Sequence, residues 1–123
     1  LSPPDMKHPI LTALSYPEYV NNSLERLDFS KQFSLSFSPP RYKDFPMLSL
    51  AYDAVKLGGA YTIAYNAANE VAVHAFLQGK ILFTDIALIT EKVLLKDWGR
   101  ICTSFDEVSN MDEQARREAG GLC

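Results

Sequence analysis

Glu70 and His74 come closest to a chemical pair in this sequence, because four positions separate them on a predicted helix. Residues four apart lie on the same side of a helix, and Asn66 continues that side. A carboxylate beside an imidazole can bind a metal ion or transfer protons. Two ligands make no metal site, however, and no HExxH or ExxH motif completes the set. The pattern favours a polar seam beside the core, in which Asn66 and Asn69 bond to loops.

The possible nucleophiles and the second histidine lack the neighbours that catalysis needs. No serine lies in a G-x-S-x-G motif, so a hydrolase of that class is unsupported. Cys102 and Cys123 have no activating residue beside them in the sequence. His8 follows Lys7 in a proline-rich segment that we expect to be extended, which favours a position on the surface.

Phosphate-binding motifs are missing as well. The pair Gly58-Gly59 fits neither G-x-G-x-x-G nor GK[ST], and its place favours the end of a helix. Arg116 and Arg117 lie on a predicted helix that is mostly polar. We therefore expect them on a solvated face rather than at a phosphate site. From the residues alone, we therefore expect a helical domain with no catalytic residue and no metal ligand of its own.

The stretch from Ala60 to Gly79 predicts one long helix at the centre of that domain. At about 100° per residue, its apolar positions cover one wide face and, in the last turns, almost the whole circumference. A helix of this kind is usually surrounded by other helices. Its alanines leave little bulk, so neighbouring helices can approach closely, and they are Ala64, Ala67, Ala68, Ala72 and Ala75.

Further helices are predicted on both sides of this one. One or two turns should follow Pro9, covering Ile10 to Ser15. A helix over 46–57 should bury the stripe of Leu48, Ala51, Tyr52 and Val55. Another should begin at Thr84 as N-cap, with Phe83 stapled to Leu88, and should stop at Trp98-Gly99. It should carry Ile86, Ile89, Val93 and Leu94 inward. The last helix should run from Met111 to Ala119. Ser104 with Glu107 is a possible capping box before it, and Asn110 with Glu113 is a second, looser one.

One strand is also predicted, over 29–40. Phe33, Leu35 and Phe37 alternate with serines, which is the period of a strand with one buried face. A lone strand cannot satisfy its backbone groups, so it must pair with something outside the predicted elements. The fold class is thus mainly α: a bundle of about four helices after an extended segment with one strand.

Composition limits the partners and the compartment. The net charge of −3 and the pI near 5.3 argue against a nucleic-acid binder. No apolar run is long enough to span a membrane, and the N-terminus lacks the apolar core of a signal peptide. Two cysteines make no disulfide framework and favour a reducing cytoplasm. The start at Leu1 hints at a piece of a longer protein.

Three stretches together resemble a known enzyme family. They are PDMKHPILTALSYPE, LDFSKQFSLSFSPPRYKDFPMLSLAYDAVKLGG and YNAANEVAVHAFLQGKILFTDI. Their order and spacing are similar to those of 1-deoxy-D-xylulose 5-phosphate reductoisomerase, over about residues 3 to 95. The most specific part of this resemblance is the string NAANE before an apolar helix. The next most specific part is the string PDM before PI. Met47 and Tyr65 depart from the family pattern, which bears on packing alone.

The resemblance implies an α+β parent enzyme that is NADPH-dependent, homodimeric and in need of a divalent metal, Mg²⁺ or Mn²⁺. Its substrate is a linear sugar phosphate, rearranged and reduced to 2-C-methyl-D-erythritol 4-phosphate in non-mevalonate isoprenoid biosynthesis. By this likeness, residues 1–20 end the central catalytic domain, 21–44 form the linker, and 45–123 form the C-terminal helical domain. The implied place is the cytoplasm, or the plastid in a plastid-bearing organism.

The same likeness transfers few site residues to this chain. Pro4 and Met6 match the Pro-Asp-Met motif that, in the family, lies beside the nicotinamide ring, so they are the predicted cofactor-binding residues. The metal-binding carboxylates and phosphate-binding residues of the family belong to other segments. We therefore expect the fragment alone to be inactive and to bind neither NADPH nor metal. The alternative is a free-standing helical module that docks a protein partner and catalyses nothing.

Overall fold

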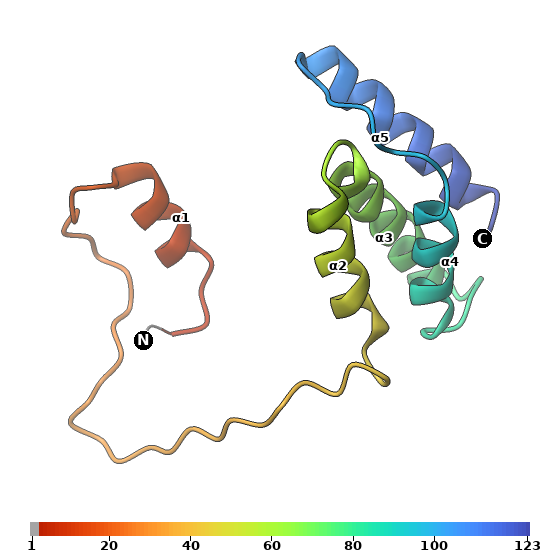
Figure 1. The fold of residues 1–123 in the computed structure, drawn as a ribbon. Helices are drawn as coiled ribbons and strands as arrows, with labels where there is room; N and C mark the ends of the chain where they lie inside the picture. The colour runs from red at the N-terminus through yellow and green to blue at the C-terminus, as the bar shows by residue number, and fades with distance from the viewer. Residues whose placement is uncertain (1–2) are drawn as a thin grey trace. The chain divides into compact units, whose positions relative to one another are not determined.

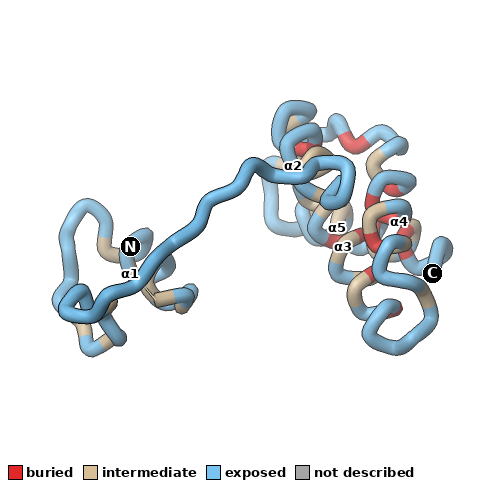
Figure 2. The backbone as a smooth tube through the Cα atoms, turned by 90° about the horizontal axis from the view of Figure 1, so that it is seen from below, coloured by how far each residue is buried: buried red, intermediate tan, exposed pale blue. Residues whose placement is uncertain are grey.

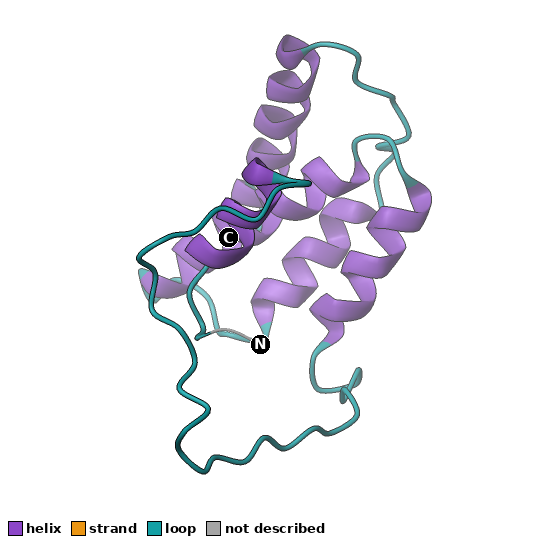
Figure 3. Cartoon of the chain, turned by 90° about the vertical axis from the view of Figure 1, so that its left-hand side faces the viewer, coloured by secondary structure: helices purple, strands orange, loops and turns teal. Residues whose placement is uncertain are grey.

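Five helices form in residues 3–123, the part of the chain that the computed structural model describes, and no strand forms in that part (Figures 1 and 3). The chain makes two compact units, one that ends at Ser38 and one that comprises Pro39–Cys123. The mainly α fold predicted from the sequence is confirmed. None of the helices in the described residues is long and apolar enough to cross a bilayer.

The centre of the second unit is α3, which spans Tyr61–Leu77. It contacts three helices: α2 (Pro46–Leu57), α4 (Asp85–Leu94) and α5 (Phe105–Gly120). This confirms the predicted central helix to within two residues at either end. All five alanines that the sequence marked for close packing are buried. Buried positions gather in this helical unit in Figure 2, where α2 to α5 carry the red segments. Small side chains on α3 thus let three helices pack around it.

Replacing Ala72 or Ala75 with leucine is expected to lower the free energy of unfolding by roughly 1–3 kcal/mol. Both methyl groups are buried on α3, so extra carbons must displace a neighbouring helix. The matched control is Ala13→Leu on an exposed position of α1, where a change within about 0.5 kcal/mol is expected. Chemical denaturation measures the difference, and equal stability of all three variants would show that α3 is not central.

Helix α2 spans Pro46–Leu57, the bounds predicted from its proline and its two glycines, but it buries a different face. Leu48 is 36% exposed, and Tyr52 and Val55 are more than half exposed. The buried residue is Ala54, with Leu50 half-buried one turn earlier. The predicted stripe was therefore wrong for its large members. A close approach to α3 favours the small side chain, and the bulky ones remain on the outside.

Helix α4 spans Asp85–Leu94 and buries the predicted Ile86, Ile89 and Val93. The predicted N-cap at Thr84 was wrong, because its side chain makes no capping bond and its backbone is already helical. The Asp85 carboxylate instead accepts a hydrogen bond from the Leu82 backbone N–H at 2.8 Å. An acidic group also suits the positive end of a helix, so Asp85 closes this turn in place of Thr84. The predicted Phe83–Leu88 staple is not confirmed, since both side chains are more than half exposed.

Helix α4 ends at Leu94, so the predicted stop at Trp98 was wrong by four residues, and Trp98 has another role. Its side chain is 1% exposed, and its indole N–H donates to the Val93 carbonyl at 2.8 Å. Its own carbonyl accepts from the Ala60 N–H at 2.8 Å. The tryptophan therefore joins the end of α4 to the start of α3, at the turn of Gly58 and Gly59.

Helix α5 spans Phe105–Gly120 and begins six residues before the predicted start. Ser104 is its N-cap, since the Ser104 Oγ accepts from the Glu107 backbone N–H at 3.2 Å. The Glu107 carboxylate accepts from the Thr103 backbone N–H at 2.7 Å and from Arg100 Nη2 at 2.7 Å. These bonds lower the pKa of Glu107 to about 2. The predicted capping box is thus right for the serine, while the glutamate reaches one residue further back.

The first unit carries α1, which spans Lys7–Ser15 and begins three residues before the predicted turns. The Asp5 carboxylate accepts from the Lys7 N–H at 2.9 Å, which starts the helix before Pro9. The strand predicted over 29–40 is not confirmed, because residues 32–40 run as loop without a paired neighbour. A strand exists only with a partner to complete its ladder, and the described residues supply none.

Candidate functional site

Pro4 and Met6, the predicted cofactor-binding residues, lie in a tight turn that leads into α1. The Asp5 N–H donates to the Pro3 carbonyl at 2.7 Å, and the Asp5 side chain caps Lys7. The fixed φ of Pro4 and these bonds together hold the backbone on both sides of Met6. Pro4 is exposed, and the Met6 side chain is 71% exposed. The turn therefore presents a flexible thioether on a constrained backbone.

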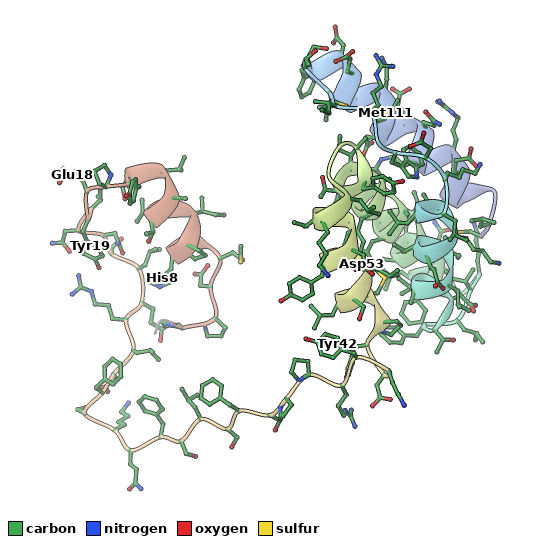
Figure 4. The ribbon with its side chains drawn as sticks, viewed as in Figure 1. His8, Glu18, Tyr19, Tyr42, Asp53 and Met111 are labelled. Atoms are coloured by element: carbon green, nitrogen blue, oxygen red, sulfur yellow. The ribbon has the colours of Figure 1, made fainter. Side chains whose placement is uncertain are left out.

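His8 anchors this turn to the segment that follows α1. Its Nε2 lies 3.0 Å from the Glu25 carbonyl oxygen, so the tautomer with a proton on Nε2 donates that bond. The residue, labelled in Figure 4, is half-buried rather than fully on the surface. The main-chain carbonyl of His8 accepts a hydrogen bond from Thr12 Oγ1 at 2.9 Å. This histidine has a structural partner on both sides and positions α1.

Glu70 and His74 are not brought together by the structure. Glu70 Oε2 lies 2.6 Å from Arg116 Nη2, and its Oε1 accepts from Asn66 Nδ2 at 3.3 Å. The hydrogen bond and the charge of Arg116 hold the pKa of Glu70 below its ordinary value. His74 instead lies 3.3 Å from the Gln78 amide. A polar seam is present and fastens α3 to α5. The predicted bond from Asn66 to a loop was wrong, because Asn66 bonds to Glu70 within α3.

Arg116 carries most of that fastening, which the sequence did not indicate. Besides Glu70, its guanidinium contacts both oxygens of Asp112, at 2.6 Å and 3.2 Å. These two carboxylates raise the pKa of Arg116, which therefore stays charged. The predicted solvated face describes Arg117, whose side chain is 71% exposed, but not Arg116. The sequence carried a signal for the Asp112 contact, an acid four residues before an arginine on one helix, but none for the contact with Glu70.

No cluster of metal-binding side chains forms within residues 3–123. No three carboxylate, imidazole or thiolate groups in that range come close enough to share a metal ion. Cys102 and Cys123 are free thiols. The Cys123 Sγ donates to the Ala119 carbonyl at 3.3 Å, and desolvation raises the pKa of this thiol. A thiol held in the protonated form is a poor nucleophile, so the structure gives Cys123 no catalytic setting.

A pocket of about 480 Å³ opens in the helical unit where α2, α3 and α4 meet. Its walls are mostly apolar and include Phe45, Val73 and Leu88, while Asn69 contributes an amide. The volume lies in the range of small-molecule pockets. Sequence reasoning missed it, because its walls come from three separate segments whose packing no local pattern encodes. It contains neither of the predicted cofactor-binding residues.

Comparison with known proteins gives one consistent answer. The family model described as DXP reductoisomerase C-terminal domain matches residues 1–118. A 1-deoxy-D-xylulose 5-phosphate reductoisomerase of Treponema denticola is 54% identical over 115 residues, which cover 94% of this chain and 30% of that protein. The chain thus spans about a third or less of the length of the relatives it matches.

Solved structures agree with the sequence relatives. The reductoisomerase of Zymomonas mobilis in complex with NADPH superposes with a TM-score of 0.83 at 42% identity, covering 99% of this chain and 32% of that one. A DOX-P reductoisomerase crystal structure with fosmidomycin and magnesium superposes with a TM-score of 0.76 at 38% identity, covering 98% and 32%.

Fold and site together define a helical-bundle domain, preceded by an arm that presents an apolar side chain at a tight turn. Within that class of domains, the family model identifies one family. The chain belongs to the family of the DXP reductoisomerase C-terminal domain. The resemblance drawn from the PDM and NAANE motifs is thereby confirmed.

Proposed function

We propose that this chain is the C-terminal part of an NADPH-dependent reductoisomerase. The full-length protein would convert 1-deoxy-D-xylulose 5-phosphate to 2-C-methyl-D-erythritol 4-phosphate in non-mevalonate isoprenoid biosynthesis, as a cytoplasmic or plastid homodimer. The observation that carries this proposal is the family match over residues 1–118, which includes the Pro4–Met6 turn. The likeness to a solved reductoisomerase that binds NADPH, at 42% identity over 99% of this chain, supports it further.

In this proposal Met6 touches the nicotinamide ring. Its side chain fits the task, because it is apolar, polarisable and exposed on a backbone held by the Pro4 turn. A thioether has no proton to transfer, so Met6 would position the ring and exclude water from it. NADPH, when bound, supplies the hydride. Pro4 would act through the backbone that it fixes.

The helical unit would contribute no reacting group. Two of its carboxylates, those of Glu107 and Glu70, are engaged in capping and in an ion pair. The described residues do not fit a metal site, so the divalent ion of the full-length enzyme, Mg²⁺ or Mn²⁺, would be held by residues outside this chain. The sugar phosphate would likewise bind outside the helical unit.

The isolated chain is expected to bind neither NADPH nor Mn²⁺ with micromolar affinity. It lacks a phosphate loop and, in its described part, any cluster of three metal ligands. Isothermal titration calorimetry of the 123-residue chain against each ligand measures this directly. Micromolar binding of either one would overturn our assignment of both sites to the rest of the polypeptide.

The proposal for the whole protein has its own test. The full-length polypeptide should oxidise NADPH only when both 1-deoxy-D-xylulose 5-phosphate and a divalent metal are supplied. A free-standing interaction module is the second candidate, favoured by the exposed stripe of Leu48, Tyr52 and Val55 on α2. An inactive full-length protein that captures a partner through this stripe would support the module instead.

A further inference from the structure

His8 is the polar member of the side of α1 that faces the chain as it returns past the helix. Half-buried positions on α1 recur at His8, Leu11 and Ser15, spacings of three and four that mark one side of a helix. The residues directly before and after His8 are exposed. Figure 4 shows His8 between α1 and the segment that follows it. The imidazole therefore belongs to the packed side of this unit, at the end of α1 that carries Met6.

The segment that receives the imidazole is held by hydrogen bonds of its own asparagines. The Asn22 Oδ1 accepts from the Leu24 N–H at 3.0 Å. Arg26 Nη2 donates to the Asn21 Oδ1, also at 3.0 Å. Local bonds from asparagine side chains of this kind shape the backbone of turns. They hold the main chain on both sides of Glu25, whose carbonyl is thus presented at a defined place.

The bond from His8 to Glu25 joins α1 to that segment. The His8 Nε2 lies 3.0 Å from the Glu25 carbonyl oxygen, although 17 positions separate the two residues in the chain. Within residues 3–38, no other hydrogen bond crosses from α1 to residues 20–27. The imidazole is therefore the polar tie between the helix and the chain that returns past it.

Met6 moves with the start of α1, because its main chain is part of the first turn of that helix. The Met6 carbonyl accepts from the Ile10 N–H at 3.2 Å, and the His8 N–H donates to the Asp5 carbonyl at 3.3 Å. The Met6 backbone is itself helical, with a φ of −63° and a ψ of −17°. A tilt or a shift of α1 would therefore carry the Met6 side chain with it.

We propose that His8 is a positioning residue for the contact between Met6 and the nicotinamide ring. By donating to the Glu25 carbonyl, the imidazole fixes the start of α1 and so sets where the Met6 side chain lies. The inference rests on the proposed function and deepens it, because it names a residue that acts on the cofactor through Met6. His8 itself transfers no proton and touches neither substrate nor cofactor.

Variants of the full-length polypeptide separate the N–H donor of His8 from its ring. His8→Phe keeps a planar ring and removes the donor, whereas His8→Gln keeps a donor and removes the ring. We expect His8→Phe to slow single-turnover hydride transfer about 3–10-fold and to raise the KM for NADPH, since a misplacement of about 1 Å can cost about 100-fold and the loss of one tie moves Met6 by less. The KM for the sugar phosphate should stay within about twofold, and His8→Gln should recover most of the rate.

Two further variants guard against a general loss of structure. His8→Ala removes the donor without a bulky replacement and should behave as His8→Phe does. The matched control is His74→Phe on α3, where the wild-type imidazole lies 3.3 Å from the Gln78 amide of its own helical segment. This control should leave hydride transfer and both KM values unchanged.

A double-mutant cycle tests whether His8 acts through Met6. In the Met6→Ala background, His8→Phe should change hydride transfer by less than about twofold, because the side chain that His8 positions is already gone. Amide hydrogen exchange of the peptide that contains the first turn of α1 follows the tie without any activity readout. Exchange should be faster in His8→Phe and should return towards the wild-type rate in His8→Gln.

The outcomes distinguish this inference from the proposed function. Unchanged hydride transfer in His8→Phe, independent effects of His8→Phe and Met6→Ala, or equal changes in both KM values would overturn the positioning role and leave the reductoisomerase assignment intact. Failure of His8→Gln to recover the rate would also overturn it. A wild-type polypeptide that oxidises no NADPH with the sugar phosphate and a divalent metal would instead overturn the proposed function, and the positioning role with it.

Discussion

Replacing Met6 with alanine in the full-length polypeptide is expected to slow hydride transfer by roughly 10–100-fold and to weaken NADPH binding. The side chain is 71% exposed in this unit, so its removal costs little internal packing. Its loss would instead open space beside the nicotinamide ring, and a misplacement of about 1 Å can cost that much in rate. Steady-state kinetics with varied NADPH, together with single-turnover rates, separate the two effects.

The pH profile and the metal requirement should not change in this variant, because a thioether has no proton that titrates. Met6→Leu, which keeps an apolar side chain of similar length, should recover most of the rate. Leu14→Ala, on the last turn of α1 and also highly exposed, is the matched control and should leave the kinetics unchanged. Unaltered kinetics in Met6→Ala would remove the residue from the site, and a shifted pH optimum would show that its role is different.

Local signals in the sequence were enough to place most helices. Pro46 and the two glycines after Leu57 set both ends of α2, because proline suits the first helical turn and glycine follows the last. The apolar run of α3 was likewise sufficient to identify the central helix. The start of α5 was missed although Ser104 marked it, since the first turns of that helix carry few buried residues. Capping chemistry was the better guide there than periodicity.

Which face a helix buries was harder to predict than where it begins and ends. On α2, both the side of Ala54 and the side of Tyr52 are apolar, so periodicity alone could not choose between them. The choice depends on α3, whose small residues admit Ala54 at close range. Tyr65 on α3 also donates a hydrogen bond to the Met47 carbonyl at 3.2 Å, which helps to set the rotation of α2.

The candidate site was predictable only as far as a motif could identify it. The family resemblance predicts Pro4 and Met6 as cofactor-binding residues, which stays a prediction, and the structure adds the turn in which they lie. The pocket between α2, α3 and α4, and the link from Arg116 to Glu70, join residues far apart in the chain. Contacts of that kind depend on the packed fold, so a single sequence does not specify them. The predicted domain limits at residues 20 and 44 stay predictions.

Replacing Gly59 with alanine is expected to lower the free energy of unfolding of the helical unit by about 2–4 kcal/mol. Gly59 has a φ of +54°, and a Cβ there would lie 2.8 Å from the Gly99 carbonyl oxygen and 2.9 Å from that of Trp98. These atoms belong to the backbone, so no side-chain rotation can relieve the clash. The Trp98 carbonyl also accepts from the Ala60 N–H, and any shift would weaken the joint between α3 and α4.

Gly58→Ala is the matched control for this prediction, because the two glycines are adjacent and both have a positive φ. Gly58 has a φ of +70°, but a Cβ there would meet nothing within 4 Å. It should therefore cost only the backbone strain, roughly 1–3 kcal/mol, because a φ of +70° with a ψ of −153° is a conformation that L side chains rarely adopt. Urea denaturation of both variants, followed by the fluorescence of Trp98, the single tryptophan, gives the two free energies. If Gly59→Ala loses no more stability than Gly58→Ala, the close approach of the two turns does not constrain the fold, and the strained φ alone explains the glycines.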